Sequence, residues 1–371
     1  MGANMAQVLS DIPLEDEISI AGPDGDSRWT CSFFAFNTAI GVTAYADRSD
    51  PNRIRDVFHA VAARCRRLER LFSRFLPESD IMRLNNACGS WVAISRETYE
   101  LLRASLRFCK ASEGAFDITM GTVCALWDFT RGIIPDREDV EHALAHVDWH
   151  CIELREDGGC RTDSMPNVAD TLSSEGTSGR YRGRMADPAA KLDVGGIAKG
   201  WIADDLQALM QSHGVACGII NLGGNALVFG EKPDGEPWHV GIRNPFETQQ
   251  VLCALSISEG SVVTSGPYER FFEKGGRRYH HILSPRTGFP VETDLASASI
   301  ISRRSIDGDG YSTTMFSLGS KRALHMVDDL PDIEALFVRS DGKILISRGL
   351  RLTDQSADGQ PFLALRSPAC I

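Results

Sequence analysis

Apolar residues recur with the period of a helix in most segments early in this chain and with the pattern of short strands in most segments after residue 218. Over 53–72, Val57, Val61, Leu68 and Leu71 fall on one side of a helix. Further helices are predicted at 97–109, 137–146, 201–211 and 311–328. Strands are predicted within 29–46 and at 219–222, 226–229, 238–242, 252–257, 261–264, 279–283 and 296–302. A hairpin joins 335–338 to 343–347 through Asp341-Gly342. With most helices early and most strands late, the fold class is α+β rather than a regular βαβ alternation.

Two polar stretches interrupt this pattern. Residues 1–28 are acidic and lack apolar periodicity, which predicts a flexible N-terminal segment. Residues 157–186 are rich in Asp, Gly, Ser, Thr and Pro, which predicts a mobile insertion. We expect residues 29–371 to form a single domain around that insertion.

Composition narrows the function classes. The formal net charge of −11 argues against nucleic acid as a partner, because such binding rests on neutralising phosphates. No apolar run is long enough to span a bilayer, and no secretory signal opens the chain. The ten cysteines form no C-x-x-C pair, which predicts reduced thiols and no zinc site. The expected location is cytoplasmic, without membrane insertion.

The most informative segment is the turn at 193–200, Asp-Val-Gly-Gly-Ile-Ala-Lys-Gly, between a predicted strand at 191–194 and the helix at 201–211. Glycines at the start of a helix let backbone N–H groups approach an anion, and Lys199 lies within reach of the same anion. The spacing matches neither a dinucleotide-binding fingerprint nor a P-loop. A turn that serves packing alone remains the alternative.

Four more segments carry candidate chemistry: 221–225 with two glycines, 264–270 with Ser265 and Gly266, 279–290 with two histidines, and 309–313 at a predicted helix start. Singly, each is also explained as turn chemistry or a helix cap. His280 and His281 point to opposite faces if they lie in a strand, so one is expected in a cleft and the other packed.

In this order, the segments resemble the ApbE family, the FAD:protein FMN transferases, over about residues 38–319. Six motifs carry the resemblance: an early strand at 36–38, S-R-F to S-D-I-M-R-L-N at 73–85, G-A-F-D-I-T to L-W at 114–127, D-V-G-G-I-A-K-G at 193–200, S-V-V-T-S-G-P-Y-E-R at 261–270, and H-I-L-S-P-R-T-G-F-P at 281–290. The helix start with Asp309 and Thr313 is similar to the family's metal-binding helix. The chain departs from the family at Ser284, where Asp is usual, and at Asn37, Gly308, Gly310 and Thr314.

The resemblance implies an ApbE-like, T-fold-related architecture with FAD as donor and Mg²⁺ (or Mn²⁺) as cofactor. Asp309 and Thr313 lie four residues apart, so they share one face of a helix at its first turn. The family pattern adds the carbonyl of Gly196 as the third metal ligand. It implies His281 as general base and Lys199 as a catalytic cation. The residues expected to bind FAD are Thr38, Ser73, Arg74, Phe75, Ala115, Phe116, Asp117, Gly195, Gly196, Lys199, Gly224, Ser265, Gly266, His281, Arg286 and Thr287.

The implied reaction moves the FMN moiety of FAD to a Thr or Ser hydroxyl of an acceptor protein, and AMP leaves. The expected acceptor carries a D-x-x-[ST]-G-A-[ST]-type motif, which this chain lacks. Two alternatives stay open: a Mg²⁺-dependent FAD pyrophosphatase that uses water as acceptor, and a non-catalytic FAD-binding protein.

Overall fold

A computed structural model describes residues 18–25, 27–46, 51–157, 180–353 and 362–365. Its centre is a nine-stranded sheet in which every neighbouring pair is antiparallel. In spatial order the strands are β1 (Ser19–Ala21), β2 (Arg28–Ala35), β3 (Thr38–Tyr45), β7 (Cys217–Leu222), β8 (Asn225–Phe229), β11 (Gly260–Ser265), β14 (Leu295–Ser302), β15 (Ile333–Arg339) and β16 (Ile344–Ile346). Strands from both ends of the chain therefore share one sheet, and the α+β fold class is confirmed.

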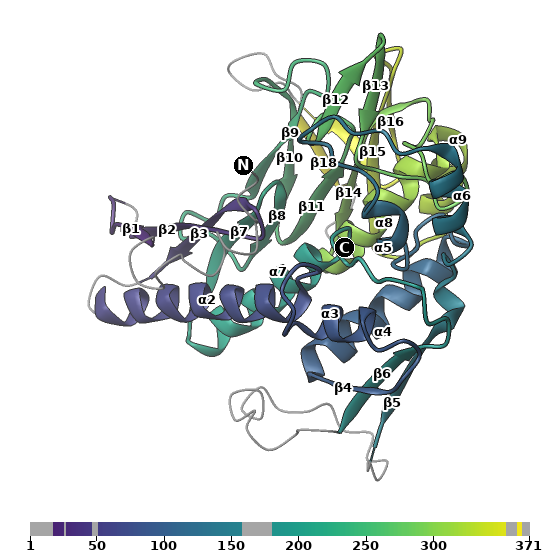
Figure 1. The fold of residues 1–371 in the computed structure, drawn as a ribbon. Helices are drawn as coiled ribbons and strands as arrows, with labels where there is room; N and C mark the ends of the chain where they lie inside the picture. Colours follow the sequence, from purple (N-terminus) through teal and green to yellow (C-terminus); the bar gives the residue numbers. More distant parts are fainter. Residues whose placement is uncertain (1–17, 26, 47–50, 158–179, 354–361, 366–371) are drawn as a thin grey trace.

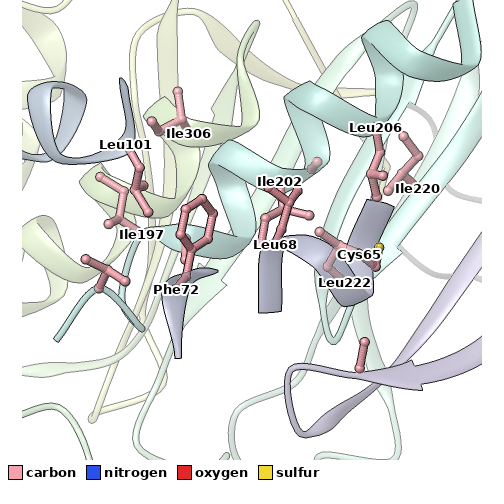
Figure 2. Packing of buried hydrophobic residues seen from close by; sticks show 14 of the residues in the cluster. Cys65, Leu68, Phe72, Leu101, Ile197, Ile202, Leu206, Ile220, Leu222 and Ile306 are labelled. Atoms are coloured by element: carbon pink, nitrogen blue, oxygen red, sulfur yellow. The ribbon is translucent and has the colours of Figure 1, made fainter. Parts of the chain in front are cut away.

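Helices cover one face of this sheet (Figure 1). They are α2 (Pro51–Phe72), α7 (Ala198–Ser212), α8 (Ser305–Leu318) and α9 (Ser320–Asp328). Apolar side chains from α2 and α7 meet the sheet in one continuous core, as Figure 2 shows for Leu68, Ile202 and Ile220. Because α8 carries Ile306 into that core, the helix is anchored at its first turn.

A second sheet packs on the opposite face of the main sheet. Its order is β17 (Leu350–Thr353), β18 (Phe362–Leu365), β10 (Val251–Ile257) and β9 (Trp238–Arg243). Trp238 and Leu255 are buried in a cluster with Val228 and Ile301 of the main sheet. The central strands are thus buried on both faces, and in β14 every residue except Ala296 is buried.

The remaining early elements gather beside α7 and α8. They are α3 (Asp80–Asn85), α4 (Arg96–Ala111), α5 (Gly121–Cys124), α6 (Arg137–Leu144), the 3₁₀ turn Trp149–Cys151, and a sheet of β4 (Val92–Ile94), β6 (Tyr181–Met185) and β5 (Ile152–Glu156). A separate hairpin, β12 (Phe271–Lys274) with β13 (Arg277–His280), packs Phe272 and Tyr279 near Trp127. Of the helices described, none combines the length and apolar character that a bilayer crossing requires.

Several predicted elements need correction. The helix predicted at 311–328 is two helices, α8 and α9, separated at Gly319, whose φ of 76° ends α8. The segment 191–194 forms only an isolated bridge from Lys191 to Met120. The strand predicted at 279–283 ends at His280.

The predictions for the two flexible segments, 1–28 and 157–186, also need correction. Residues 1–17 and 158–179 lie outside the described residues. Ser19–Ala21, however, forms β1 and pairs with β2, so flexibility is wrong for that part of 1–28. Tyr181–Met185 forms β6 with Tyr181 and Met185 buried, so a mobile insertion is wrong for those residues. Long-range pairing supplied order that local composition did not indicate.

The eight described cysteines are all free thiols, in agreement with the prediction. Cys31, Cys217 and Cys253 are buried, whereas Cys124 is only half-buried. Cys160 and Cys370 lie outside the described residues.

Candidate active site

The glycine-rich turn presents exposed backbone at the start of α7. Gly195 and Gly196 are both exposed, and α7 begins two residues later at Ala198. The Gly195 N–H donates to Oδ1 of Asp193 over 2.9 Å, which fixes the turn. A β-carbon on Gly196 would lie 3.3 Å from the Phe116 ring. The turn is therefore supported on one side and open on the other, at the positive end of the helix dipole.

Buried Asn85 holds the residues that lead into this turn. Its Oδ1 accepts the Leu192 N–H over 2.6 Å, and its Nδ2 donates to the Leu192 carbonyl over 3.1 Å. The Asp193 N–H donates to the Ile118 carbonyl over 2.8 Å. Nε of Arg74 lies 3.4 Å from Oδ2 of Asp193. Residues of two other segments, Arg74 and Asn85 in 73–85 and Ile118 in 114–127, thus position the glycine turn.

Arg74 belongs to the predicted FAD-binding segment 73–75. Its guanidinium lies 4.8 Å from the centre of the Phe75 ring, and Phe75 is 49% exposed. The Ser73 hydroxyl accepts the Phe75 N–H over 3.1 Å, so Ser73 shapes the turn that presents the other two. An exposed aromatic ring next to Arg74, which itself contacts Asp193, is a suitable surface for a planar ligand.

In the segment 115–117, the Phe116 ring lies against the glycine turn. Ala115 is half-buried beside it. Both oxygens of Asp117 are used within the chain: Oδ1 accepts the Thr119 N–H over 2.8 Å, and Oδ2 accepts the Trp149 N–H over 3.1 Å. Asp117 therefore holds local structure, and FAD contact by this carboxylate stays a prediction.

Asp309 is a buried carboxylate on α8 that faces α7. It is 5% exposed, and its Oδ2 accepts the Gly200 N–H over 2.8 Å. Among the residues that the structure describes, its Oδ1 accepts no hydrogen bond. Burial raises the pKa of the carboxyl, and the nearby Lys199 ammonium opposes that shift. Asp309 is the fifth residue of α8 rather than its start, which corrects its predicted place at the first turn.

Hydroxyl groups lie one turn further along α8. Oγ1 of Thr313 is 3.2 Å from Oγ of Ser265, which donates to Oγ of Ser312 over 2.9 Å. Beside Ser265, a β-carbon on Gly266 would lie 2.3 Å from the Tyr268 ring, so no side chain fits there. Ser265 and Thr313, predicted separately for FAD and metal, are in contact.

This donor set fits a hard divalent cation. A buried carboxylate with one free oxygen, followed four residues later by a hydroxyl, offers two oxygen ligands on one helix face. Within the described ranges, no three His, Cys, Asp or Glu side chains gather as a metal-ligand cluster. A single carboxylate suits Mg²⁺, which completes its coordination with water and substrate phosphate. Gly200, the hydrogen-bond partner of Asp309, lies four residues after Gly196. The role of the Gly196 carbonyl as a metal ligand stays a prediction.

Lys199 acts electrostatically on several groups of the site. Desolvation raises the pKa of the Glu269 carboxyl, and Lys199 opposes that shift as it does for Asp309. Lys199 also contributes to the lowered pKa of His281. The Lys199 ammonium therefore acts electrostatically on the carboxylates of Asp309 and Glu269 and on His281, the candidate base.

His281 follows the last residue of β13 and is half-buried. Its N–H donates to the Arg270 carbonyl over 3.1 Å, and its Nδ1 lies 3.3 Å from the same oxygen. Burial, more than the neighbouring cations, lowers its pKa to about 4. His280 is buried, with Nε2 3.2 Å from the Val291 carbonyl and its ring against Phe316. The expected division into a packed and an accessible histidine agrees with this arrangement.

The loop after His281 is closed by Ser284. Its carbonyl accepts the Gly288 N–H over 2.8 Å, and its hydroxyl accepts the Arg286 N–H over 3.2 Å. Trp127 donates from Nε1 to the Gly288 carbonyl over 3.0 Å. The hydroxyl of Ser284 thus serves the turn where the family usually has a carboxylate, and the loop presents Arg286 and Thr287 as exposed residues.

Thr38 lies against Gly223 at the β7–β8 turn, and Gly224 is the next residue of that turn. A β-carbon on Gly223 would lie 2.3 Å from Oγ1 of Thr38, and one on Gly224 would lie 3.7 Å from Oε1 of Glu269. Strand β3, this turn and the segment that ends β11 therefore lie side by side. Glu269, Asn85 and Asp204 were not among the predicted site residues. No local signal marks Asp204, because the residues that it contacts lie 101 and 102 residues further along the chain.

Comparison with known proteins agrees with this geometry. The model of the ApbE family matches residues 36–337, which include every predicted site residue. The chain belongs to the ApbE family.

Relatives within the ApbE family are similar over most of their length. The chain is 35% identical over 294 residues to a protein named FAD:protein FMN transferase of Treponema pallidum (strain Nichols), covering 76% of each chain. It is 33% identical to one of the same name in Klebsiella pneumoniae (strain 342), covering 77% of this chain and 83% of the relative. A crystal structure of the ApbE protein of Thermotoga maritima superposes with a TM-score of 0.74 at 29% identity, over 86% of this chain and 97% of that one.

Proposed function

We propose that this chain is a FAD:protein FMN transferase that uses Mg²⁺, or Mn²⁺ in its place, and releases AMP. The relatives in Treponema pallidum and Klebsiella pneumoniae carry that name. The observation that carries the proposal is the buried Asp309 carboxylate, held by Gly200 at the base of the glycine turn and followed by the Thr313 hydroxyl. A protein that only bound FAD would not require this carboxylate, because burying it is unfavourable without a cation.

In the proposed reaction, the hydroxyl oxygen of an acceptor Thr or Ser forms a bond to the FMN-side phosphorus of FAD. The anhydride bond to the AMP-side oxygen breaks, and AMP leaves with the bonding electrons. The bound divalent ion would polarise the attacked phosphate and neutralise charge on it. Lys199 and the exposed backbone at Gly196 would bind the pyrophosphate from the protein side.

His281 would take the proton from the acceptor hydroxyl. A pKa of about 4 keeps the imidazole neutral at pH 7, so it is able to accept a proton. If Nδ1 donates to the Arg270 carbonyl, Nε2 is the accepting atom. The negative charges of bound FAD would offset Lys199 and Arg270 and raise the pKa of His281 toward the range of an effective base.

The test is incubation with FAD, Mg²⁺ and an acceptor protein carrying the D-x-x-[ST]-G-A-[ST] motif. Intact mass should show one FMN added to the acceptor, with one AMP released per transfer and no transfer when EDTA removes the metal. An acceptor whose motif hydroxyls are replaced by Ala is the matched control. Release of FMN and AMP at the full rate without acceptor would favour the pyrophosphatase alternative, and FAD binding without turnover would favour the non-catalytic one.

A further inference from the structure

Helix α8, which carries Asp309 and Thr313, has no side-chain cap of its own. Its N-cap residue is Arg304, which makes no capping hydrogen bond. The cap comes from another helix instead. Asp204 of α7 accepts the Ser305 N–H over 2.7 Å and the Ile306 N–H over 3.1 Å, one with each carboxylate oxygen. Two of the free N–H groups that begin α8 are therefore satisfied by α7.

The hydroxyl of Ser305 adds contacts to two strands. It donates to Oδ1 of Asn225 in β8 over 2.7 Å and accepts from Oγ of Ser261 in β11 over 2.9 Å. Asn225, Ser261 and Ser305 are all buried. The first residue of α8 is thus held by side chains of one helix and two strands.

These contacts lie one helical turn from the candidate metal ligand. Ser305 precedes Asp309 by four residues, and Gly200 precedes Asp204 by four residues on α7. The Gly200 N–H binds the Asp309 carboxylate, while Asp204 binds the start of α8. Two contacts, one turn apart on each helix, therefore fix the direction in which the Asp309 carboxylate points.

We propose that Asp204 is a positioning residue for the divalent-ion site, acting from outside the cleft by capping the helix that carries Asp309. The proposal rests on the proposed function, because it assumes that Asp309 binds the ion. Without the cap, the first turn of α8 frays, and ion binding must then order it again. The free energy of that ordering is subtracted from the binding free energy.

The test measures Mn²⁺ affinity by the electron paramagnetic resonance signal of free Mn²⁺, with no FAD and no turnover. The variants are Asp204→Asn, which keeps one acceptor oxygen, and Asp204→Ala, which keeps none. The matched control is Asp205→Asn, because Asp205 is the next residue on α7 but binds Arg64 of α2 over 2.8 Å rather than α8. Thermal unfolding of each protein measures the purely structural effect.

We expect Asp204→Ala to raise the Kd for Mn²⁺ roughly 3- to 30-fold, the range that corresponds to losing a helix N-cap. Asp204→Asn should fall between Asp204→Ala and the wild type. The Asp205→Asn variant should lower the unfolding temperature while leaving the Kd within twofold of wild type. In transfer assays, excess Mg²⁺ should restore kcat in Asp204→Asn, since the defect lies in ion affinity.

Equal Kd values in Asp204→Ala and wild type would overturn the proposal, as would an equal rise in Asp205→Asn. If wild-type protein bound no Mn²⁺, the proposed metal site itself would be wrong, which separates the two failures. If Asp204→Ala did not fold, Asp204→Asn would decide: a wild-type Kd in that variant with a lowered unfolding temperature would assign Asp204 a structural role only.

Discussion

The backbone of Gly200 approaches Asp309 so closely that no other residue fits at position 200. Besides the 2.8 Å hydrogen bond between the Gly200 N–H and Oδ2 of Asp309, a β-carbon at 200 would lie 2.5 Å from the Ser305 carbonyl oxygen and 2.7 Å from Cβ of Asp309. The last of the three glycines in the 193–200 motif is thus explained by helix packing. Gly196, four residues earlier, remains the candidate for ligand contact.

Gly200→Ala should separate α7 from α8. Overpacking of this kind costs about 1–3 kcal/mol, and it should also weaken Mn²⁺ binding because the Asp309 carboxylate moves. Urea unfolding and Mn²⁺ affinity measure the two effects. Gly41→Ala is the control, because nothing lies within 4 Å of a β-carbon there; equal stability of the two variants would contradict this packing.

Asp309→Asn should abolish metal-dependent transfer while leaving the metal-free protein at least as stable as wild type. The amide keeps an acceptor for the Gly200 N–H but removes the charge whose burial raises the pKa of Asp309, and burying a charge is costly. Calorimetry with and without Mg²⁺ tests this. Thr313→Ala should be milder, about tenfold or less, because water can replace a neutral hydroxyl. Wild-type metal dependence in Asp309→Asn would show that the ion binds elsewhere.

His281→Ala should lower flavin transfer by about 10²-fold or more, the usual contribution of a general base, with little change in FAD affinity. His280→Ala should affect transfer less, since its ring packs on Phe316. Because the His281 pKa is lowered to about 4, kcat/KM should show no limb near pH 6.5, the ordinary histidine value, and should fall only as pH approaches 4. A limb at pH 6.5 that disappears in His281→Ala would contradict the lowered pKa.

Protonation of His280 and His281 should lower the free energy of unfolding as pH drops from about 6.5 toward 4. Burial lowers the pKa of both His280 and His281 to about 4, so the unfolded chain binds protons in this window that the folded chain does not. Asp204, with its pKa raised to about 6, opposes this contribution, and so do Asp309 and Glu269, whose pKa burial also raises. Urea unfolding should show that the free energy of unfolding changes less between pH 7 and pH 5 in His280→Gln than in wild type. An unchanged difference would mean that His280 does not titrate in this way.

Asn85→Ala should destabilise the protein by about 2–4 kcal/mol, because it leaves the buried N–H and carbonyl of Leu192 without partners. FAD affinity should fall as well, since Leu192 leads into the glycine turn. The neighbouring Asn86→Ala is the control, as Asn86 is exposed. Similar effects in both variants would show that Asn85 is not the residue that holds the turn.

Much of the fold was predictable from local signals. The predicted helix at 53–72 is α2, and the one at 201–211 lies within α7, because each has a clear apolar stripe or glycine boundary. The start of α8 was not predictable in this way. Gly308 and Gly310 are poor helix formers, and the cap from Asp204 comes from 101 residues away. A local sequence pattern cannot indicate a contact between residues so far apart in the chain.

The sequence predicted which segments form the candidate site, but it did not predict which residues of those segments contact one another. The motifs indicated Lys199, Asp309 and His281, and the structure brings them within electrostatic range. The pairing of Thr313 with Ser265 depends on how β11 lies against α8, which tertiary packing decides. For the same reason, the roles of Asn85 and Asp204 became visible only in three dimensions.

The way α8 begins has a consequence for biosynthesis. Its first residue is held by Asp204, Asn225 and Ser261, and all three leave the ribosome before Ser305. A nascent chain therefore contains the residues of the glycine turn, helix α7 and strands β8 and β11 while Asp309 is still unsynthesised or inside the exit tunnel. Such an intermediate lacks the carboxylate that we propose as the metal ligand, so in the proposed mechanism flavin transfer cannot start on an unfinished polypeptide.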